Sequence, residues 1–145
     1  MKKNLVISTI AAIAAQNPEG YTVNAANLKP ITSGYAVALA VTQDSFGAKG
    51  LEKVVDVIER MQNQGEDSRF DGLAFGGWYN KKNGRYYYDA TVIVKDRTEA
   101  LELARVNGQL AIYDLDNLDE IRLDDKIKPW GPVPAPLLSL YYTTI

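Results

Sequence analysis

The chain has 145 residues, enough for one domain of ordinary size, and its 46% apolar and 23% charged residues are typical of a globular protein. Its net charge of −2 argues against a general nucleic-acid binder, which normally carries a basic face. There is no Cys and no His, which excludes disulfides, thiolate nucleophiles, Cys/His zinc sites and imidazole acid–base catalysis. Catalysis would have to use Asp, Glu, Lys, Tyr or Ser, so we expect neither an enzyme nor a cofactor.

The first 17 residues are apolar after a basic start. Lys2 and Lys3 precede a run of Leu, Val, Ile and Ala, which resembles a secretory signal peptide cleaved after Ala14 or Ala15. The run is short for a signal peptide and too short to span a bilayer. We therefore favour an amphipathic N-terminal helix or arm and keep the secreted or periplasmic protein as the alternative.

The middle of the chain has the pattern of an α+β domain. In the first half we expect a turn at 17–20, a short strand at 21–24, a loop at 25–34, a strand at 35–42 and a helix from about 47 that ends at Gly65. In the second half we expect strands at 72–80 and 85–94, a helix capped by Asp96 and ended by Gly108, a strand at 109–114, a turn at 116–117 and a short edge strand at 120–123. From 35 to 115 this is the ferredoxin-like (split βαβ, β-α-β-β-α-β) order. Both helices would cover one face of an antiparallel sheet, which leaves the other face for another cover.

Local patterns add details to these elements. In 35–42 large apolar residues alternate with alanines, which predicts that the alanine face lies close to a helix. Asp44 or Ser45 is expected to cap the helix that follows. In the strand at 109–114 we expect Leu110 and Ile112 to be buried, and the pattern leaves open whether Tyr113 is buried as well.

The predicted hairpin in the centre of the chain organises the rest. Asn83 and Gly84 both tolerate positive φ, which favours a type I′ turn between the strands. Gly76 and Gly77 within the first strand predict a bulge or a close approach by another backbone. Along the second strand, odd-numbered and even-numbered residues are expected on opposite faces.

Six short blocks between residues 33 and 123 form a fairly specific set. They are Ser33-Gly34-Tyr35-Ala36-Val37, Thr42-Gln43-Asp44-Ser45-Phe46-Gly47, Gly50-Leu51, Gly76-Gly77-Trp78, Tyr86-Tyr87-Tyr88-Asp89 and Asn107-Gly108-Gln109-Leu110-Ala111-Ile112-Tyr113-Asp114. The set resembles a small domain that recurs in reading frames of bacterial phages and mobile elements. The resemblance implies a phage or mobile-element context, and it carries over no catalytic residue.

The last segment differs in composition from the domain. Pro129 to Pro136 prefers an extended or polyproline conformation, and the apolar stretch that follows favours strand. We expect this tail to add a strand to the sheet or to dock on another subunit. The chain thus divides into an N-terminal arm and loop (1–34), an α+β core (35–123) and a C-terminal tail (124–145).

Aromatic and large apolar side chains of the hairpin and the tail are the candidate protein interface. They are Trp78, Tyr79, Tyr86, Tyr87, Tyr88, Trp130, Leu137, Leu138, Tyr141 and Tyr142. Aromatic residues dominate both cores and interfaces, so at least one of the three consecutive tyrosines is expected in the core. Alternatively, Trp78 and the tyrosines could stack bases while Lys81, Lys82 and Arg85 meet phosphates, as in single-stranded nucleic-acid modules. The strand lacks the alternating Gly/aromatic pattern of those modules.

Two polar stretches are interpreted as local structure. The acidic residues around 114–125 resemble part of a calcium loop, but the required Gly and distal Glu are misplaced, which favours a turn. Residues 43–47 lie where a helix N-terminus could bind an anion, but they lack the Lys of a P-loop, which favours a helix cap. Neither stretch predicts a metal or a cofactor.

Taken together, these patterns predict a non-catalytic protein-binding module. The expected setting is a virion structural or accessory component, in the virion or the host bacterial cytoplasm, that docks through its terminal arms on other virion subunits or on itself. Four alternatives stay open: an inhibitor or regulator of a host protein, the secreted or periplasmic protein, the single-stranded nucleic-acid module, and an enzyme that uses only carboxylates and Tyr.

Overall fold

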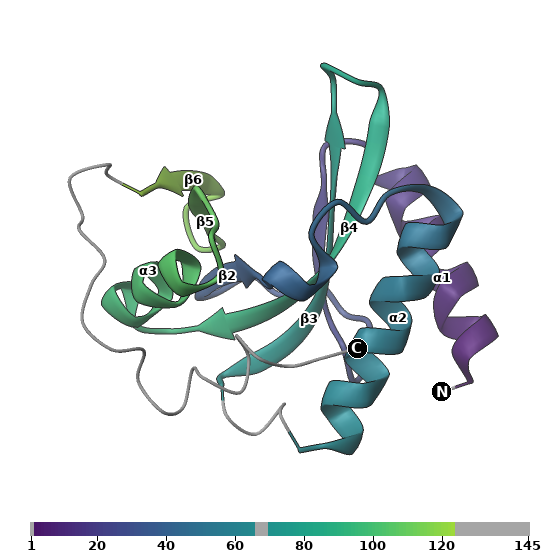
Figure 1. Cartoon of the computed structure of the whole chain (residues 1–145), viewed down its shortest axis with the longest axis horizontal. Coiled ribbons are helices and arrows are strands. Elements are labelled where there is room, and N and C mark those ends of the chain that lie inside the picture. Colours follow the sequence, from purple (N-terminus) through teal and green to yellow (C-terminus); the bar gives the residue numbers. More distant parts are fainter. Residues whose placement is uncertain (1, 66–69, 124–145) are drawn as a thin grey trace.

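The computed structural model describes residues 2–65 and 70–123, and it confirms an α+β fold (Figure 1). The described residues form three α-helices, a short 3-10 helix and six strands. In chain order these are α1 (Lys3–Gln16), β1 (Tyr21–Asn24), β2 (Tyr35–Ala38), η1 (Ala40–Thr42), α2 (Gly47–Asn63), β3 (Gly72–Asn80), β4 (Arg85–Val94), α3 (Arg97–Val106), β5 (Ala111–Asp114) and β6 (Asp119–Arg122).

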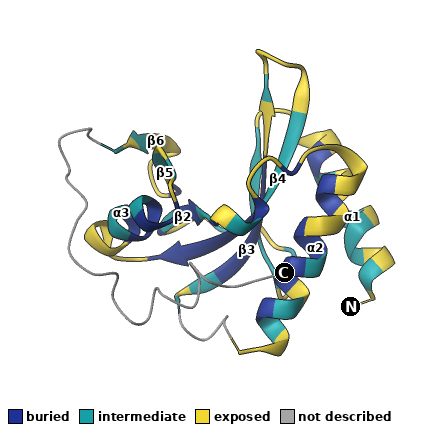
Figure 2. Cartoon of the chain, viewed as in Figure 1, coloured by how far each residue is buried: buried dark blue, intermediate teal, exposed yellow. Residues whose placement is uncertain are grey.

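The six strands make one antiparallel sheet in the order β1-β3-β4-β2-β5-β6. Side chains from α1, α2 and α3 enter the same core cluster, with Ile10, Val54 and Leu103 as buried examples. This core lies against the face of β4 that carries Val92 and Val94, so the helices share one side of the sheet. Figure 2 shows the buried residues along the sheet and on the inward sides of the helices.

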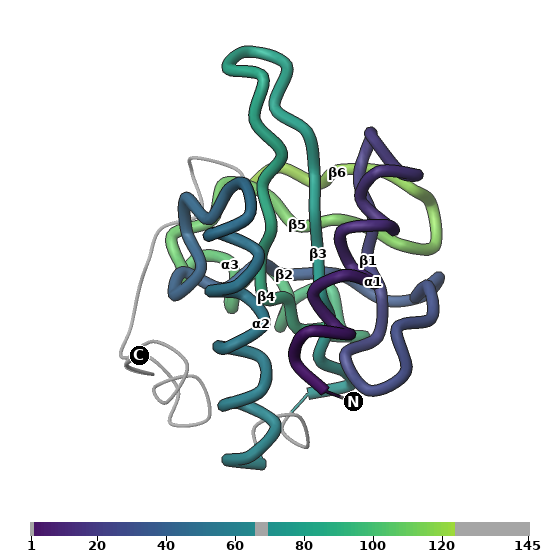
Figure 3. The backbone as a smooth tube through the Cα atoms, turned by 90° about the vertical axis from the view of Figure 1, so that its right-hand side faces the viewer, coloured from purple at the N-terminus to yellow at the C-terminus, as the bar shows by residue number. Residues whose placement is uncertain are grey.

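Helix α1 packs against the core of the domain. Ile10 is fully buried in the core cluster, and Val6, Ile7 and Ile13 pack against the cluster at its edge. The ammonium group of Lys3 lies 2.7 Å from a carboxylate oxygen of Asp56, which ties the start of α1 to α2. Figures 1 and 3 both place α1 beside α2. The expected helix at the N-terminus therefore forms, and its apolar side chains contact the domain itself.

Both strands of the β3–β4 hairpin have the predicted bounds, 72–80 and 85–94. Nine residue pairs run without a bulge from Gly72 opposite Ile93 to Asn80 opposite Arg85. The predicted two-residue type I′ turn is wrong, because four residues join the strands and only Gly84 among them has positive φ. The amide of Gly84 donates to the carbonyl of Asn80 over 2.9 Å and closes this longer loop.

Two expectations about the segment from 35 to 47 are wrong. The strand stops at Ala38 and gives way to η1, and the alanine side faces away from the helices, where Ala36 meets Ala74, Ile93 and Leu115. The larger residues Val37 and Leu39 face the helices instead. Neither Asp44 nor Ser45 caps α2, because Phe46 occupies the N-cap position before Gly47 and provides no side-chain cap.

The second half of the domain follows the prediction more closely. Asp96 caps α3 by accepting a hydrogen bond from the amide of Thr98 over 2.8 Å. Ile112 is buried as expected, whereas Leu110 and Tyr113 are exposed, because Leu110 precedes the strand and Tyr113 lies on its outer face. The tail at 124–145, including its expected strand or arm, lies outside the described residues.

Candidate functional site

The free end of the β3–β4 hairpin projects beyond the rest of the described chain (Figures 1 and 3). Trp78 is 46% exposed and Tyr79 is 41% exposed, which is unusual for large aromatic side chains on a regular sheet. The Trp78 ring stacks on Tyr87 of the opposite strand with centroids 5.1 Å apart. Figure 2 shows the hairpin tip as exposed, so the Trp78–Tyr87 pair lies next to an accessible surface.

Phe46 joins the hairpin aromatics from the loop before α2. Its ring lies 5.7 Å from Tyr87, and the guanidinium carbon of Arg85 lies 4.2 Å from its centroid. A cation over an aromatic face at this distance is an attractive arrangement. The stack of Trp78, Tyr87, Phe46 and Arg85 is called the hairpin platform below. Sequence reasoning missed Phe46, since it is distant in the chain and joins β4 only through an isolated bridge to Tyr87.

The other predicted tyrosines turn toward the helix side of the sheet. Tyr86 stacks on Tyr21 with centroids 6.3 Å apart, and its hydroxyl donates to the carbonyl of Asn17 over 2.7 Å. Tyr88 packs against the core cluster. The structure therefore separates the candidate interface into an exposed group and an internal group. The tail candidates Trp130, Leu137, Leu138, Tyr141 and Tyr142 lie outside the described residues.

The glycine pair in β3 lets these side chains approach one another. A Cβ on Gly77 would lie 2.3 Å from the Tyr21 ring and 2.9 Å from the Tyr86 ring. A Cβ on Gly76 would lie 2.5 Å from a carboxylate oxygen of Asp89. The prediction of a bulge or of a close approach by another backbone is wrong, because the ladder runs unbroken through both glycines and the atoms that lie close to them belong to side chains.

A pocket of about 200 Å³ lies at the foot of the hairpin platform. Its lining comes from the end of β2, from η1 and the loop after it, from β3 and β4, and from Gln109 before β5. The lining residues are Ala38, Leu39, Thr42, Gln43, Asp44, Trp78, Asn80, Tyr87, Tyr88, Asp89 and Gln109. The site therefore gathers aromatic, amide and carboxyl groups from five parts of the chain.

Two buried polar residues hold the walls of the pocket in place. The hydroxyl of Thr42 accepts from the amide of Ala90 over 3.0 Å, at the point where β2 has left the ladder. The side chain of Asn107 accepts from the amide of Ala40 and donates to the carbonyl of Leu103, each over 3.0 Å, which fastens η1 to the end of α3. Because buried backbone groups need partners, these bonds define the path of η1.

Asp89 is one of the ionisable residues that line the pocket. Its carboxylate accepts a hydrogen bond from the hydroxyl of Thr91, and within the described residues it forms no ion pair. Desolvation raises the pKa of Asp89 to about 6, and the bond from Thr91 opposes this shift. Its negative charge also contributes to the raised pKa of Tyr21 and of Tyr86, the latter at about 12. Sequence reasoning had one signal for this residue, because Asp is disfavoured inside strands.

Replacing Asp89 by Asn should stabilise the protein at neutral pH. The carboxyl has a higher pKa in the folded chain than its ordinary value of 3.8, so the folded state loses stability as pH rises from about 4 to about 6. Above that window we expect Asp89→Asn to unfold with a free energy higher by about 2 kcal/mol. Below pH 4 the two proteins should converge. Urea unfolding from pH 3.5 to 8 measures this, with exposed Asp119→Asn as the control.

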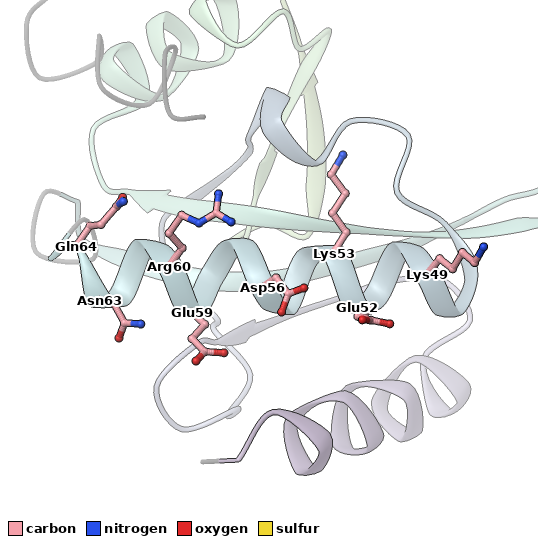
Figure 4. Close-up of a pocket in the computed structure, with 8 residues that line it drawn as sticks. All are labelled: Lys49, Glu52, Lys53, Asp56, Glu59, Arg60, Asn63 and Gln64. Atoms are coloured by element: carbon pink, nitrogen blue, oxygen red, sulfur yellow. The ribbon is translucent and has the colours of Figure 1, made fainter. Parts of the chain in front are cut away.

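A larger hollow of about 840 Å³ runs along the outer side of α2 (Figure 4). It is lined by Lys49, Glu52, Lys53, Asp56, Glu59, Arg60, Asn63 and Gln64. These side chains all come from one helix and its end, and three acidic groups balance three basic ones. The hollow has no aromatic wall and no opposing element among its lining residues. We therefore place the candidate site at the hairpin and not on α2.

The acidic stretch near β5 forms the predicted turn. The carboxylate of Asp114 accepts from the amides of Asp116 and Asn117 over 3.0 and 3.2 Å and from the Asn117 side chain over 2.7 Å. The Asn117 side-chain bond is the main reason that the pKa of Asp114 is lowered. Within residues 2–65 and 70–123, no three acidic side chains gather as a metal site requires. In the same ranges no helix is long and apolar enough to cross a membrane.

Comparisons of the chain with protein-family models, with curated proteins and with solved structures find no match.

Proposed function

We propose that this chain is a non-catalytic protein-binding module and that the free end of the β3–β4 hairpin is its contact surface, with the hairpin platform on one face and Tyr79 on the other. The observation that carries the proposal is the exposure of Trp78, Tyr79 and Phe46 at 46%, 41% and 39% on one projecting hairpin and its neighbouring loop. Trp, Tyr and Arg are the residue types that most often dominate binding energy at protein interfaces. Because the rings already stack on one another, little side-chain entropy remains to be lost on binding.

Charge indicates what kind of partner would fit. Residues 78–88 carry Lys81, Lys82 and Arg85 and no acidic residue, although the whole chain has a net charge of −2. We propose a protein partner that presents carboxylates around an apolar patch, since complementary charge speeds association and fixes orientation. Nucleic acid fits less well, because only three cations accompany the aromatic rings and one of them, Arg85, already lies over Phe46.

The phage or mobile-element setting belongs to the same proposal. A virion structural or accessory component is the preferred role, and an inhibitor or regulator of a host protein is the alternative. The N-terminal arm is no longer the main candidate for docking, because the apolar side of α1 contacts α2 and the sheet. The proposal therefore assigns the contact to the hairpin first and keeps the tail as a second contact.

We also propose that β2 to β5 form a ferredoxin-like unit to which α1, β1 and β6 are added. The support is that β4 lies between β2 and β3, the two strands that α2 connects, and that β2 lies between β4 and β5, which α3 connects. Two interleaved β-α-β units of this kind are the split βαβ arrangement.

A photocrosslinking experiment in the native host tests the contact surface. A photoreactive phenylalanine analogue replaces Tyr79 in one variant and the 71% exposed Leu110 in a control variant. We expect a discrete protein adduct from position 79 and none from position 110. With the purified partner, Trp78→Ala should weaken binding at least 30-fold, which corresponds to about 2 kcal/mol, and Leu110→Ala should leave it unchanged. Equal adducts from both positions, or an adduct that nuclease removes, would overturn the proposal.

A further inference from the structure

The pocket below the hairpin platform has an unbalanced charge. Asp44 and Asp89 both line it, and no Lys or Arg is among its lining residues. The other ionisable side chains there are Tyr87 and Tyr88, and the nearest described cation on the same strand, Arg85, lies over Phe46. A partly desolvated carboxylate without a cation is costly, and a positively charged ligand would compensate for it.

The aromatic wall of the pocket favours the same kind of ligand. Trp78 and Tyr87 lie nearly parallel, at 18°, and both border the pocket. Ring faces attract organic cations, and Trp does so most strongly. A site with a carboxylate and nearby ring surfaces suits an organic cation. A metal ion would need more oxygen ligands.

Amide groups complete the lining. Two lining residues, Gln43 and Gln109, are joined by a hydrogen bond of 3.1 Å from the side-chain nitrogen of Gln109 to the side-chain oxygen of Gln43. Asn80 lines the hairpin side, where its side-chain oxygen accepts from the amide of Lys82 over 2.9 Å. Amide oxygens can accept from the several N–H groups of a guanidinium or an ammonium, and they add no positive charge.

From this arrangement we infer that the pocket bordered by Asp89, Asp44, Trp78 and Tyr87 binds an organic cation, a guanidinium or ammonium group on a slim alkyl stem. The carboxylate of Asp89 pairs with the cation, and the rings of Trp78 and Tyr87 contact its stem and its charged face. The volume of about 200 Å³ suits a single side-chain-sized group. Although Trp78 and Tyr87 belong to both sites, the inference does not require a protein partner, since it rests on the lining of the pocket.

Chemical-shift titrations of the full chain test the inference, with agmatine and with arginine blocked at both backbone ends as probes. The blocked citrulline analogue has nearly the same shape without the charge and serves as the control ligand. We expect agmatine to shift the Trp78 indole N–H and the Asp89 amide at pH 7.5, with the neutral analogue at least tenfold weaker. Binding of both cations indicates a site open to a side chain of a partner, and binding of agmatine alone indicates a free small molecule.

Two variants decide whether the carboxylates carry the interaction. Asp89→Asn should weaken agmatine binding at least tenfold, and exposed Asp119→Asn should not change it. Because protonation of Asp89 removes the charge, the wild-type protein should bind about tenfold more weakly at pH 5 than at pH 7.5, and Asp89→Asn should lack this difference. Asp44→Asn is the second variant, since Asn tolerates the φ of 60° at that position. Equal binding of the citrulline analogue, or unchanged binding in both carboxylate variants, would overturn the inference.

Discussion

Ile10→Ala should lower the free energy of unfolding by about 3 kcal/mol, because it removes a fully buried side chain and leaves a cavity between α1, α2 and the sheet. For a chain of this size that loss lowers the melting temperature by about 10 °C. Urea unfolding followed by far-UV circular dichroism measures the effect. The expected size follows from the place of Ile10 in the same core as Val54 and Leu103.

Leu5→Ala is the matched control on the same helix. Leu5 is 56% exposed, so its truncation should change stability by less than about 0.5 kcal/mol. A small effect at both positions would show that α1 does not contribute to the stability of the domain. Such a result would return α1 to the role of an independent arm, with its apolar side chains free for another subunit.

Gly77→Ala should destabilise the protein by about 2–3 kcal/mol through overpacking. The new methyl group would lie 2.3 Å from the ring of Tyr21 and 2.9 Å from the ring of Tyr86. Neither ring can move easily, because Tyr21 packs against the core cluster and the Tyr86 hydroxyl is bonded to the carbonyl of Asn17. We therefore expect the β1–β3 pairing to loosen, and amide exchange of β1 should accelerate more than that of β5.

Gly72→Ala in the same strand is the control for this substitution. Its methyl group would meet Ile93 at 3.4 Å, an ordinary contact, and its φ is not positive. The variant should therefore unfold within about 1 kcal/mol of the wild-type protein, with a gain possible from the stiffer unfolded chain. Equal losses at both glycines would mean that chain entropy and not ring crowding decides the effect at Gly77.

Much of the fold follows from local patterns. Alternation and turn residues determined the ends of β3 and β4, the apolar stripe determined α2, and Asp96 and Gly108 marked the limits of α3. These features depend on neighbours within a few residues, so the sequence contains the information directly. The two faces of β4 follow from alternation as well, which places Tyr87 and Asp89 on one side and Tyr86 and Tyr88 on the other.

The sequence could not decide how the segment between β2 and α2 is built. Alternation continues through Val41, yet the strand ends at Ala38, because the hydroxyl of Thr42 and the side chain of Asn107 satisfy backbone groups there. Asn107 is 67 residues away from its partner Ala40. No local rule reports such a bond, and the same bonds shape one side of the pocket.

The candidate site divides in the same way. The sequence by itself determined an aromatic, cationic hairpin without acidic residues from 78 to 88, because composition and strand pattern are local properties. Only the tertiary structure decided that Phe46 completes the platform, that Tyr86 faces Tyr21, and that Asp89 shares a pocket with Asp44. The reason is physical: which side chains meet across a sheet depends on where distant segments pack, and that depends on the burial of the whole core and not on any one stretch of the chain.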